Sequence, residues 1–511
     1  MVASLGTRAY VERVLWLGID IGTTSSRALL VDEKGRSVAG ATAPHEDVCM
    51  ERPLWAEQQP ENWWDAAQDA TRRVLAEART TGEEICGIGL SGQMHGLVTL
   101  DQNHQVIRPA LIWCDQRSQE QVDWINCKVG RENVLTYTAN PVLTGFTLPK
   151  LLWVRDHEPA NFERIRKILL PKDYVRLRLT GEYATDVSDA SGTALFDVAH
   201  RHWSAAMAER LELDSRILPS VYESSAVTGT VTEQAAAVTG LKAGTPVVAG
   251  GGDQASGAVG TGVVEPGIIS CTLGTSGVVF AHLEHPLYDP LGRVHTFCHA
   301  VNNQWHVMGV TQGAGLSLQW FRNRLAPGAS YEELTAEAAT SPAGAQGLFW
   351  LPYLMGERTP HLDAAARGGW VGLTAKHTRA DLIRALLEGV SYSQKDSLDV
   401  IEQLGAHAET VRVSGGGGRS GFWRQLLADV LGKRVAVLES QEGSAYGAAL
   451  LAMVGTGSCS SVRELCRTVI HEVESVLPRP REAGYYRGGH EIYRSLYPAL
   501  RPIYGQIQNL D

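Results

Sequence analysis

Residues 14–31, VLWLGIDIGTTSSRALLV, and residues 268–281, IISCTLGTSGVVFA, follow one pattern. In each stretch an apolar run rich in β-branched residues enters a turn of Gly, Thr and a second hydroxyl residue, and another apolar run leaves it. This pattern predicts a strand, a tight turn and a strand, with Gly22 or Gly274 permitting the reversal. Because the pattern occurs twice, we predict two related halves that meet near residue 265.

Periodic segments extend both halves. In the first half, apolar residues at helical spacing predict a helix from about Pro60, and in the second half they predict helices from about residue 313 and over residues 378–404. Leu179–Gly181 predicts a turn in an otherwise ambiguous middle region. Strands alternate with these helices, so the predicted fold class is α/β with mixed sheets. The predicted segments are an N-terminal extension at residues 1–13, a first domain at residues 14–264 and a second domain at residues 265–511.

The composition restricts the classes of partner. Among 511 residues, 56 acidic side chains exceed 46 basic ones, which gives a formal charge of −10 and argues against nucleic acid as a partner. No apolar run approaches the roughly 20 residues that a membrane span needs. Eight cysteines are too few for a disulfide scaffold, so we expect a cytoplasmic protein with free thiols.

Two hydroxyl-rich turns are candidates for phosphate binding. They lie at residues 22–25 and 274–277, and their backbone N–H groups and hydroxyls could surround phosphate oxygens. One such turn alone is usually an ordinary turn. Two at equivalent positions predict a pair of jaws around one polyphosphate, with Asp20 beside the first as a magnesium ligand, through water. The candidate phosphate-binding residues are Thr23, Thr24, Ser25, Gly274 and Thr275.

A carboxylate follows three glycines in the middle of the chain. Residues 250–252 are all Gly, and Asp253 and Gln254 come next, at the start of a small-residue helix over residues 255–262. Asp253 could simply cap that helix. A kinase, however, needs one carboxylate within hydrogen-bond reach of the acceptor hydroxyl, and Asp253 is the best candidate for that general base.

A second glycine run allows two interpretations. Gly416, Gly418 and Gly421 satisfy the G-x-G-x-x-G pattern after a predicted strand, and Glu439 lies about 20 residues further on, as in a dinucleotide-binding fingerprint. Alternatively, the glycines form a platform under an adenosine. We prefer the platform, because a dinucleotide site would leave the paired turns and Asp253 unexplained.

Several longer motifs resemble the FGGY carbohydrate kinases over nearly the whole chain. Residues 145–157, GFTLPKLLWVRDH, are similar to the family's first signature, and residues 368–388 are similar to its second. Residues 91–96 (SGQMHG), 113–118 (WCDQRS) and 171–174 (PKDY) resemble the forms found in bacterial members that phosphorylate xylulose.

The resemblance implies two actin-like, ribonuclease-H-like domains with the sugar and ATP in the cleft between them. It implies transfer of the γ-phosphoryl group of ATP to the terminal hydroxyl of D-xylulose, with Asp253 as the base and Mg²⁺ linked to Asp20. In glycerol kinases Arg-Glu replaces the sugar-contacting Met94-His95 pair, which argues against glycerol. The other matched positions are Gln254 and Asp115 for the sugar, Thr23, Thr24 and Thr275 for the phosphates, and Gly416 and Gly417 for the adenosine.

Three alternatives remain open from the sequence. The first is a sister kinase for another ketopentose or polyol, such as ribulose or L-xylulose. The second is a nucleotide-gated scaffold like actin. The third is an NAD-dependent dehydrogenase built on Gly416–Gly421. The expected partners are small molecules, and a homodimer is compatible with the acidic surface.

Overall fold

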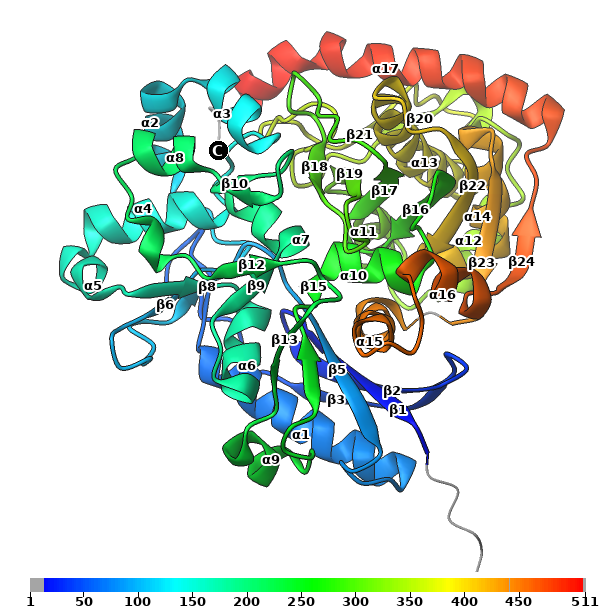
Figure 1. Ribbon diagram of the computed structural model, residues 1–511. Helices are drawn as coiled ribbons and strands as arrows, with labels where there is room; N and C mark the ends of the chain where they lie inside the picture. The colour runs from blue at the N-terminus through cyan, green and yellow to red at the C-terminus, as the bar shows by residue number, and fades with distance from the viewer. Residues whose placement is uncertain (1–12, 441, 509–511) are drawn as a thin grey trace, which may run out of the picture.

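The computed structural model describes residues 13–440 and 442–508 of the chain (Figure 1). The predicted N-terminal extension, residues 1–13, therefore lies outside the described residues except for Arg13. Two seven-stranded mixed sheets form the framework of the described part.

The first sheet has the strand order β13-β14-β5-β1-β2-β3, and β15 also pairs with β5. Its strands are β1 (Leu15–Ile21), β2 (Ser25–Asp32), β3 (Ser37–Pro44), β5 (Ile85–Gly92), β13 (Val227–Thr230), β14 (Pro246–Val248) and β15 (Gly251–Gly252). The second sheet has the order β18-β19-β17-β16-β22-β23-β24. Its strands are β16 (Gly267–Leu273), β17 (Gly277–Leu283), β18 (His295–Cys298), β19 (Trp305–Thr311), β22 (Ala408–Ser414), β23 (Arg434–Leu438) and β24 (Glu472–Val476).

The two sheets repeat one core arrangement. In the first, β1 pairs antiparallel with β2 and parallel with β5. In the second, β16 pairs antiparallel with β17 and parallel with β22. The strand, turn and strand predicted at residues 14–31 and 268–281 are confirmed as β1–β2 and β16–β17. The predicted α/β class with mixed sheets is confirmed as well.

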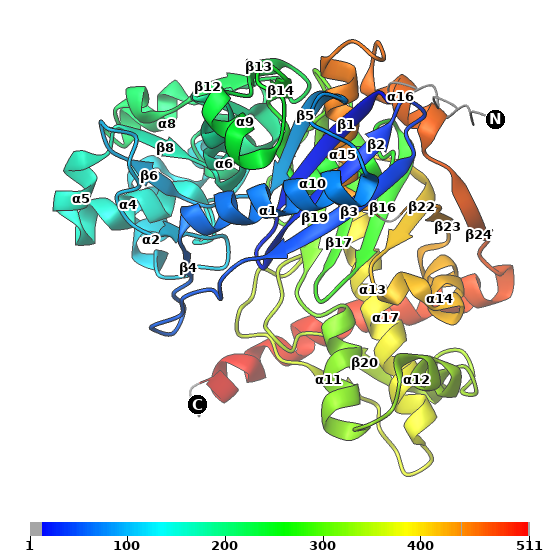
Figure 2. The same cartoon turned by 90° about the horizontal axis from the view of Figure 1, so that it is seen from below.

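Helices cover the sheets, and those with clear periodicity lie where the sequence places them. Helix α1 (Pro60–Ala78) packs on β2 and β3, as Figure 2 shows. Helix α13 (Arg379–Gln403) packs on the second sheet and starts with a capping box between Thr378 and Asp381. The other helices of the second half are α11 (Gly315–Leu325), α12 (Tyr331–Ala338), α14 (Gly421–Leu431), α15 (Gly443–Gly455), α16 (Val462–Val469) and α17 (Pro480–Gln508).

The region left ambiguous by the sequence consists mainly of short helices. They are α2 (Gln119–Val129), α3 (Arg131–Thr138), α4 (Thr147–His157), α5 (Pro159–Arg164), α6 (Pro171–Thr180), α7 (Val187–Ala190), α8 (Ala205–Arg210) and α9 (Glu233–Thr239). Helix α10 (Asp253–Gly260) lies where the sequence predicts a helix over residues 255–262. Two-stranded pairs connect them: β4 (Glu57–Gln58) with β7 (Ala110–Leu111), β6 (Val98–Leu100) with β8 (Lys167–Leu169), β9 (Ala184–Asp186) with β12 (Ser220–Tyr222), and β10 (Phe196–Asp197) with β11 (His202–Trp203). In the second half β20 (Phe349–Leu351) pairs with β21 (Gly369–Val371).

Helices α10 and α15 form a closely packed pair that links the two halves. Figure 1 shows both helices between the two sheets, and α15 also packs on β1 and β5. A Cβ on Gly18 or Gly89 would lie 1.9 Å from a backbone oxygen of α15, and a Cβ on Gly447 would lie 1.8 Å from a backbone oxygen of α10. Backbone therefore packs directly on backbone here. Because α15 lies beyond residue 265 yet covers the first sheet, the domain boundary at 264/265 stays a prediction.

The long C-terminal helix α17 completes the second half. It packs on α14 and α13 and buries four tyrosines in the core of this half, Tyr486, Tyr493, Tyr497 and Tyr504. Within residues 13–440 and 442–508, no helix combines the length and apolar character that crossing a membrane requires.

Candidate active site

Two carboxyls lie on either side of the end of β5. Asp20 on β1 is in register with Ser91 of β5, and Gly251 of β15 pairs with the same Ser91 from the other side. Asp253 follows β15 directly, as the first residue of α10. The charge of Asp20 acts on Asp253 and raises its pKa, so the two groups share one electrostatic environment.

Asp253 does not cap its helix. The N-cap position of α10 is Gly252, and no side-chain capping hydrogen bond forms there. Burial raises the pKa of Asp253 to about 7, with the charge of Asp20 adding to the effect and hydrogen bonds from Gln254 opposing it. A carboxyl with a pKa near neutrality can both accept a proton and release it, which suits a general base.

Asp20 is the second acidic group of this region. Burial raises its pKa, while the nearby Ser91 hydroxyl and the positive charge of Arg27 oppose that shift. Its Oδ1 is buried and has no hydrogen-bond partner among the described residues. A buried carboxylate oxygen without a partner is a donor that a divalent cation, or the water bound to it, could satisfy.

Met94 and His95 lie where the chain leaves β5. The Met94 side chain fills the space beside two glycines, since a Cβ on Gly252 would lie 3.0 Å from its Sδ and one on Gly192 would lie 3.1 Å from its Cε. Met94 therefore contacts the residue that precedes Asp253. The structure thus places His95 and Met94 beside Gly192, and Met94 also beside Gly252; their contact with the sugar stays a prediction.

His95 is held in one tautomer. Its ring stacks on Phe146 with centroids 4.5 Å apart, and its Nδ1 lies 2.7 Å from the carbonyl oxygen of Gly192. Burial lowers its pKa to about 3, so the ring is neutral at pH 7. Because a carbonyl only accepts, Nδ1 carries the proton and donates it there, and Nε2 is left as an acceptor for a hydroxyl.

The two Gly-Thr turns are braced differently. In the first turn, Gln58 Nε2 donates to the Thr23 carbonyl at 2.7 Å, and Trp113 Nε1 donates to Thr23 Oγ1 at 2.9 Å. In the second turn, the carbonyls of Gly274 and Thr275 accept the N–H groups at the start of α11, at 2.7 and 3.1 Å. Thr23 and Thr275 thus both have hydrogen-bond partners within the protein and are both at least partly exposed. That the two turns together bind one polyphosphate stays a prediction.

A cavity of about 700 Å³ opens between the second turn and the start of α14. Gly274 and Thr275 line one side of it, and Gly416 and Gly417 line another. Apolar and aromatic side chains complete the wall, among them Leu318, Ala336 and Phe422. Cavities of this size, with apolar walls and exposed glycine backbone, suit a nucleoside. Four of the predicted ATP-binding residues are therefore neighbours, whereas Thr23, Thr24 and Ser25 do not line this cavity.

The remaining predicted sugar residues differ in accessibility. Gln254 is partly exposed beside Asp253. Asp115 is fully buried; its carboxylate accepts from the N–H of Ala56 at 2.7 Å and pairs with Arg117 at 2.8 Å. This geometry fits a brace for the loop that carries Trp113 better than a sugar contact, and the assignment of Asp115 to the sugar stays a prediction.

Comparisons with known proteins agree with this arrangement. The N-terminal domain of the FGGY family of carbohydrate kinases matches residues 15–260, and its C-terminal domain matches residues 269–456. The chain belongs to the FGGY family of carbohydrate kinases. It is therefore a sugar kinase with the two-domain FGGY fold, and ATP is its phosphoryl donor. Membership decides against the actin-like scaffold and the dehydrogenase.

Relatives of this FGGY kinase match over nearly its full length. Xylulose kinase from Escherichia coli (strain K12) is 41% identical over 96% of this chain and 100% of its own, and that from Bacillus subtilis (strain 168) is 39% identical over 95% and 97%. The crystal structure of a xyloylose kinase from Brucella ovis superposes with a TM-score of 0.90, at 37% identity, over 96% of this chain and 100% of that one.

Buried lysines support the site of this FGGY kinase, and sequence reasoning missed both. Lys150 Nζ donates to the carbonyls of His95 and Gly145, at 3.0 and 2.6 Å. Lys172 Nζ contacts the carboxylates of Asp173, Asp186 and Asp189. Both lysines lie inside motifs that resemble the family, but a lysine is usually exposed, so nothing in one sequence indicates its burial.

Asp186 connects the second lysine to the general-base candidate. Its Oδ2 accepts the N–H and the hydroxyl of Ser188, at 2.7 and 2.5 Å. The Ser188 hydroxyl in turn accepts the N–H of Gly252 at 3.1 Å. A chain of hydrogen bonds therefore fixes the backbone immediately before Asp253.

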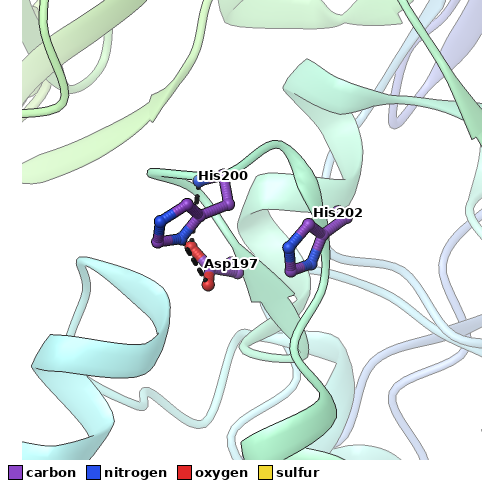
Figure 3. Close-up of side chains that lie close together, drawn as sticks. All are labelled: Asp197, His200 and His202. Atoms are coloured by element: carbon purple, nitrogen blue, oxygen red, sulfur yellow. Dashed lines mark hydrogen bonds and ion pairs between the residues drawn. The ribbon is translucent and has the colours of Figure 1, made fainter.

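One surface cluster has the composition of a metal site. Within the described residues, Asp197, His200 and His202 are the only such group, with ligand atoms within 4.8 Å of one another (Figure 3). They lie on the exposed β10–β11 hairpin. Asp197 accepts from the His200 backbone at 3.0 Å and contacts its ring at 2.9 Å, which is how an Asp closes a turn. The turn accounts for the cluster, and we assign no ion to it.

Proposed function

We propose that this FGGY kinase transfers the γ-phosphoryl group of ATP to the terminal hydroxyl of D-xylulose. The observation that carries the proposal is Asp253, a half-buried carboxyl whose pKa is raised to about 7 by removal from water and whose preceding residue, Gly252, contacts Met94. The full-length xylulose kinase relatives support the choice of sugar. A sister kinase for another ketopentose would keep the same base and differ only in the shape of the sugar pocket.

In the proposed mechanism Asp253 accepts the proton of the acceptor hydroxyl. The backbone N–H of Gly252 donates to the Ser188 hydroxyl, and this hydrogen bond positions Asp253, so its carboxyl does not have to reorganise during the reaction. His95 Nε2 accepts a hydrogen bond from a second sugar hydroxyl and thereby orients the sugar. The Gly274–Thr275 turn and the glycines of the cavity hold the nucleotide, which makes the transfer effectively intramolecular.

Magnesium belongs to the proposed function. Asp20 fits it, because the unpartnered Oδ1 is a carboxylate oxygen of the kind that Mg²⁺ binds directly or through water. When bound, the ion would neutralise charge on the phosphates. We also expect a cytoplasmic location, which the eight free thiols support. The homodimer stays a prediction.

A sugar panel tests the proposed function. ADP release is measured at fixed MgATP with D-xylulose, D-ribulose, L-ribulose, L-xylulose and glycerol in parallel. We expect the highest kcat/KM with D-xylulose. A higher kcat/KM with another sugar would change the assigned substrate but leave the assignment as a sugar kinase intact. ADP release that does not depend on any sugar would refute both assignments.

Activity should depend on pH through Asp253. Because its pKa is raised to about 7, the carboxyl is protonated and inactive as a base at lower pH. We expect kcat/KM for the sugar to fall about tenfold per pH unit well below pH 7 and to level off above it. The profile is measured between about pH 5.5 and 9, a range that brackets this pKa. A flat profile through pH 7 would contradict this assignment.

Filling the glycine-lined cavity should weaken ATP binding. A Cβ on Gly416 meets no atom within 4 Å and the residue has helical backbone angles, so a leucine fits locally and projects into the cavity. We expect Gly416→Leu to raise KM for ATP about tenfold or more and to leave the Kd of the sugar unchanged. Gly484→Leu, at an exposed and open position of α17, is the matched control. Equal KM values for ATP in the two variants would place the nucleotide elsewhere.

A further inference from the structure

Arg358 lies on a loop that is pinned beside the second phosphate turn. The neighbouring Thr359 exchanges two hydrogen bonds with Val310 near the end of β19, at 2.9 and 3.0 Å. Glu357 Oε1 accepts the N–H groups of Gln312 and Arg358, at 2.8 and 2.7 Å. These contacts hold the loop at the point where β19 ends.

The end of β19 adjoins the turn that is predicted to hold phosphate. Thr311 of β19 pairs with Gly277 of β17, and Gly277 is the last residue of the turn 274–277. The chain then continues into α11, whose first N–H, from Gly315, donates to Gly274 at 2.7 Å. The backbone of Arg358 is therefore anchored next to the nucleotide side of the site.

The guanidinium of Arg358 acts electrostatically on the sugar side. Its positive charge lowers the pKa of both His95 and His295. These two rings contact the same aromatic side chain, since the Phe146 ring lies 4.5 Å from His95 and 5.7 Å from His295. The backbone of Arg358 is thus anchored beside the phosphate turn, while its charge acts on two rings of the sugar side.

Among the described residues, the carboxyl of the adjacent Glu357 acts on the charge of Arg358 but forms no ion pair with it. Throughout residues 13–440 and 442–508, the guanidinium of Arg358 has no hydrogen bond or ion pair, and the residue is only half-buried. The adjacent Glu357 directs Oε1 at two backbone N–H groups, and burial raises its pKa to about 8. A half-buried guanidinium without an anion is costly unless a ligand supplies one.

We propose that Arg358 binds the phosphoryl group while it moves from ATP to the sugar hydroxyl. This inference rests on the proposed function. In the step, a bond forms between the sugar oxygen and the γ-phosphorus, the bond from that phosphorus to the β–γ bridging oxygen breaks, and ADP leaves. The hydroxyl proton goes to Asp253, and Arg358 stays protonated throughout. Its planar donors match two oxygens of the transferring group.

Comparing the binding of the neutral sugar with that of its anionic phosphate ester distinguishes a contact to the phosphoryl group from a contact to the sugar. D-Xylulose is neutral and its 5-phosphate is an anion, so a contact to the phosphoryl group affects only the second. We expect Arg358→Gln to lower kcat about 10²-fold and to raise the calorimetric Kd of the sugar phosphate about tenfold or more, while the Kd of the neutral sugar changes less than about twofold. Arg358→Lys keeps the charge and should recover part of kcat.

The control is Arg379→Gln, which removes an exposed guanidinium paired with Glu337 and should change none of these values. Equal losses for the neutral sugar and its phosphate, or unchanged kcat in Arg358→Gln, would overturn the inference. If the sugar panel selects another sugar, that sugar and its phosphate ester are used in place of D-xylulose and its 5-phosphate. The comparison of an anion with a neutral ligand then tests Arg358 independently of which sugar is the substrate.

Discussion

Replacing Asp253 with asparagine is expected to reduce kcat about 10²- to 10⁴-fold. The amide keeps the shape of the side chain but cannot accept the hydroxyl proton. Asp253 does not line the nucleotide cavity, so the Kd for ATP should remain close to that of the wild type. The fold should also persist, because the carboxyl is destabilised by burial and by the charge of Asp20, and an amide removes that cost.

Steady-state kinetics, ATP calorimetry and thermal unfolding of the Asp253→Asn variant provide the test. The matched control is Asp123→Asn on the exposed side of α2, where the carboxylate contacts only Gln119. Near-normal turnover in the Asp253 variant would remove this residue from the role of base. A low Tm together with low activity would instead indicate a structural role.

Replacing Lys172 with methionine should lower the free energy of unfolding by about 3–5 kcal/mol. Its Nζ lies 2.6, 3.0 and 3.4 Å from the carboxylates of Asp173, Asp186 and Asp189, and all four side chains are fully buried. These carboxylates raise the pKa of Lys172, so the lysine stays charged. Without it, three buried acids face one another without a cation.

Urea unfolding measures this loss, and Lys128→Met is the control. Lys128 pairs with Glu212 at 3.4 Å on the surface, and such pairs contribute less than about 1 kcal/mol. In the Lys172 variant kcat should fall as well, since Asp186 fixes Ser188 and through it the backbone before Asp253. A stability change of less than about 1 kcal/mol would show that the acids are neutral without the lysine.

The repeated hairpins are predictable from the sequence because their signals are local. Alternating apolar residues and a turn glycine lie within a few positions of each other at residues 14–31 and at 268–281. The parallel pairing of β1 with β5 and of β16 with β22 is not predictable in this way, since it depends on how distant segments of the chain return to the sheet. Helix α4 lacks a recognisable period because residues 147–154 are all buried, so no polar face marks the helix.

The candidate site divides in the same way. Asp253 and the two turns are marked by neighbouring glycines, which a single sequence displays. No local sequence signal marks Lys172 or Arg358. The role of Lys172 depends on carboxylates that only the fold brings near it, and that of Arg358 depends on the lack of an ion-pair partner among the described residues. Asp115 shows the converse: the motif assigns it to the sugar, and the fold pairs it with Arg117.

The backbone-to-backbone seam between α10, α15 and the first sheet sets a constraint of its own. Even a methyl group at Gly18, Gly89 or Gly447 would displace a main chain that cannot yield, unlike a flexible side chain. In a library of random variants, these three sites should be as intolerant as the base itself, although none takes part in the chemistry. Intolerance to substitution alone would therefore overstate the extent of the active site in this enzyme.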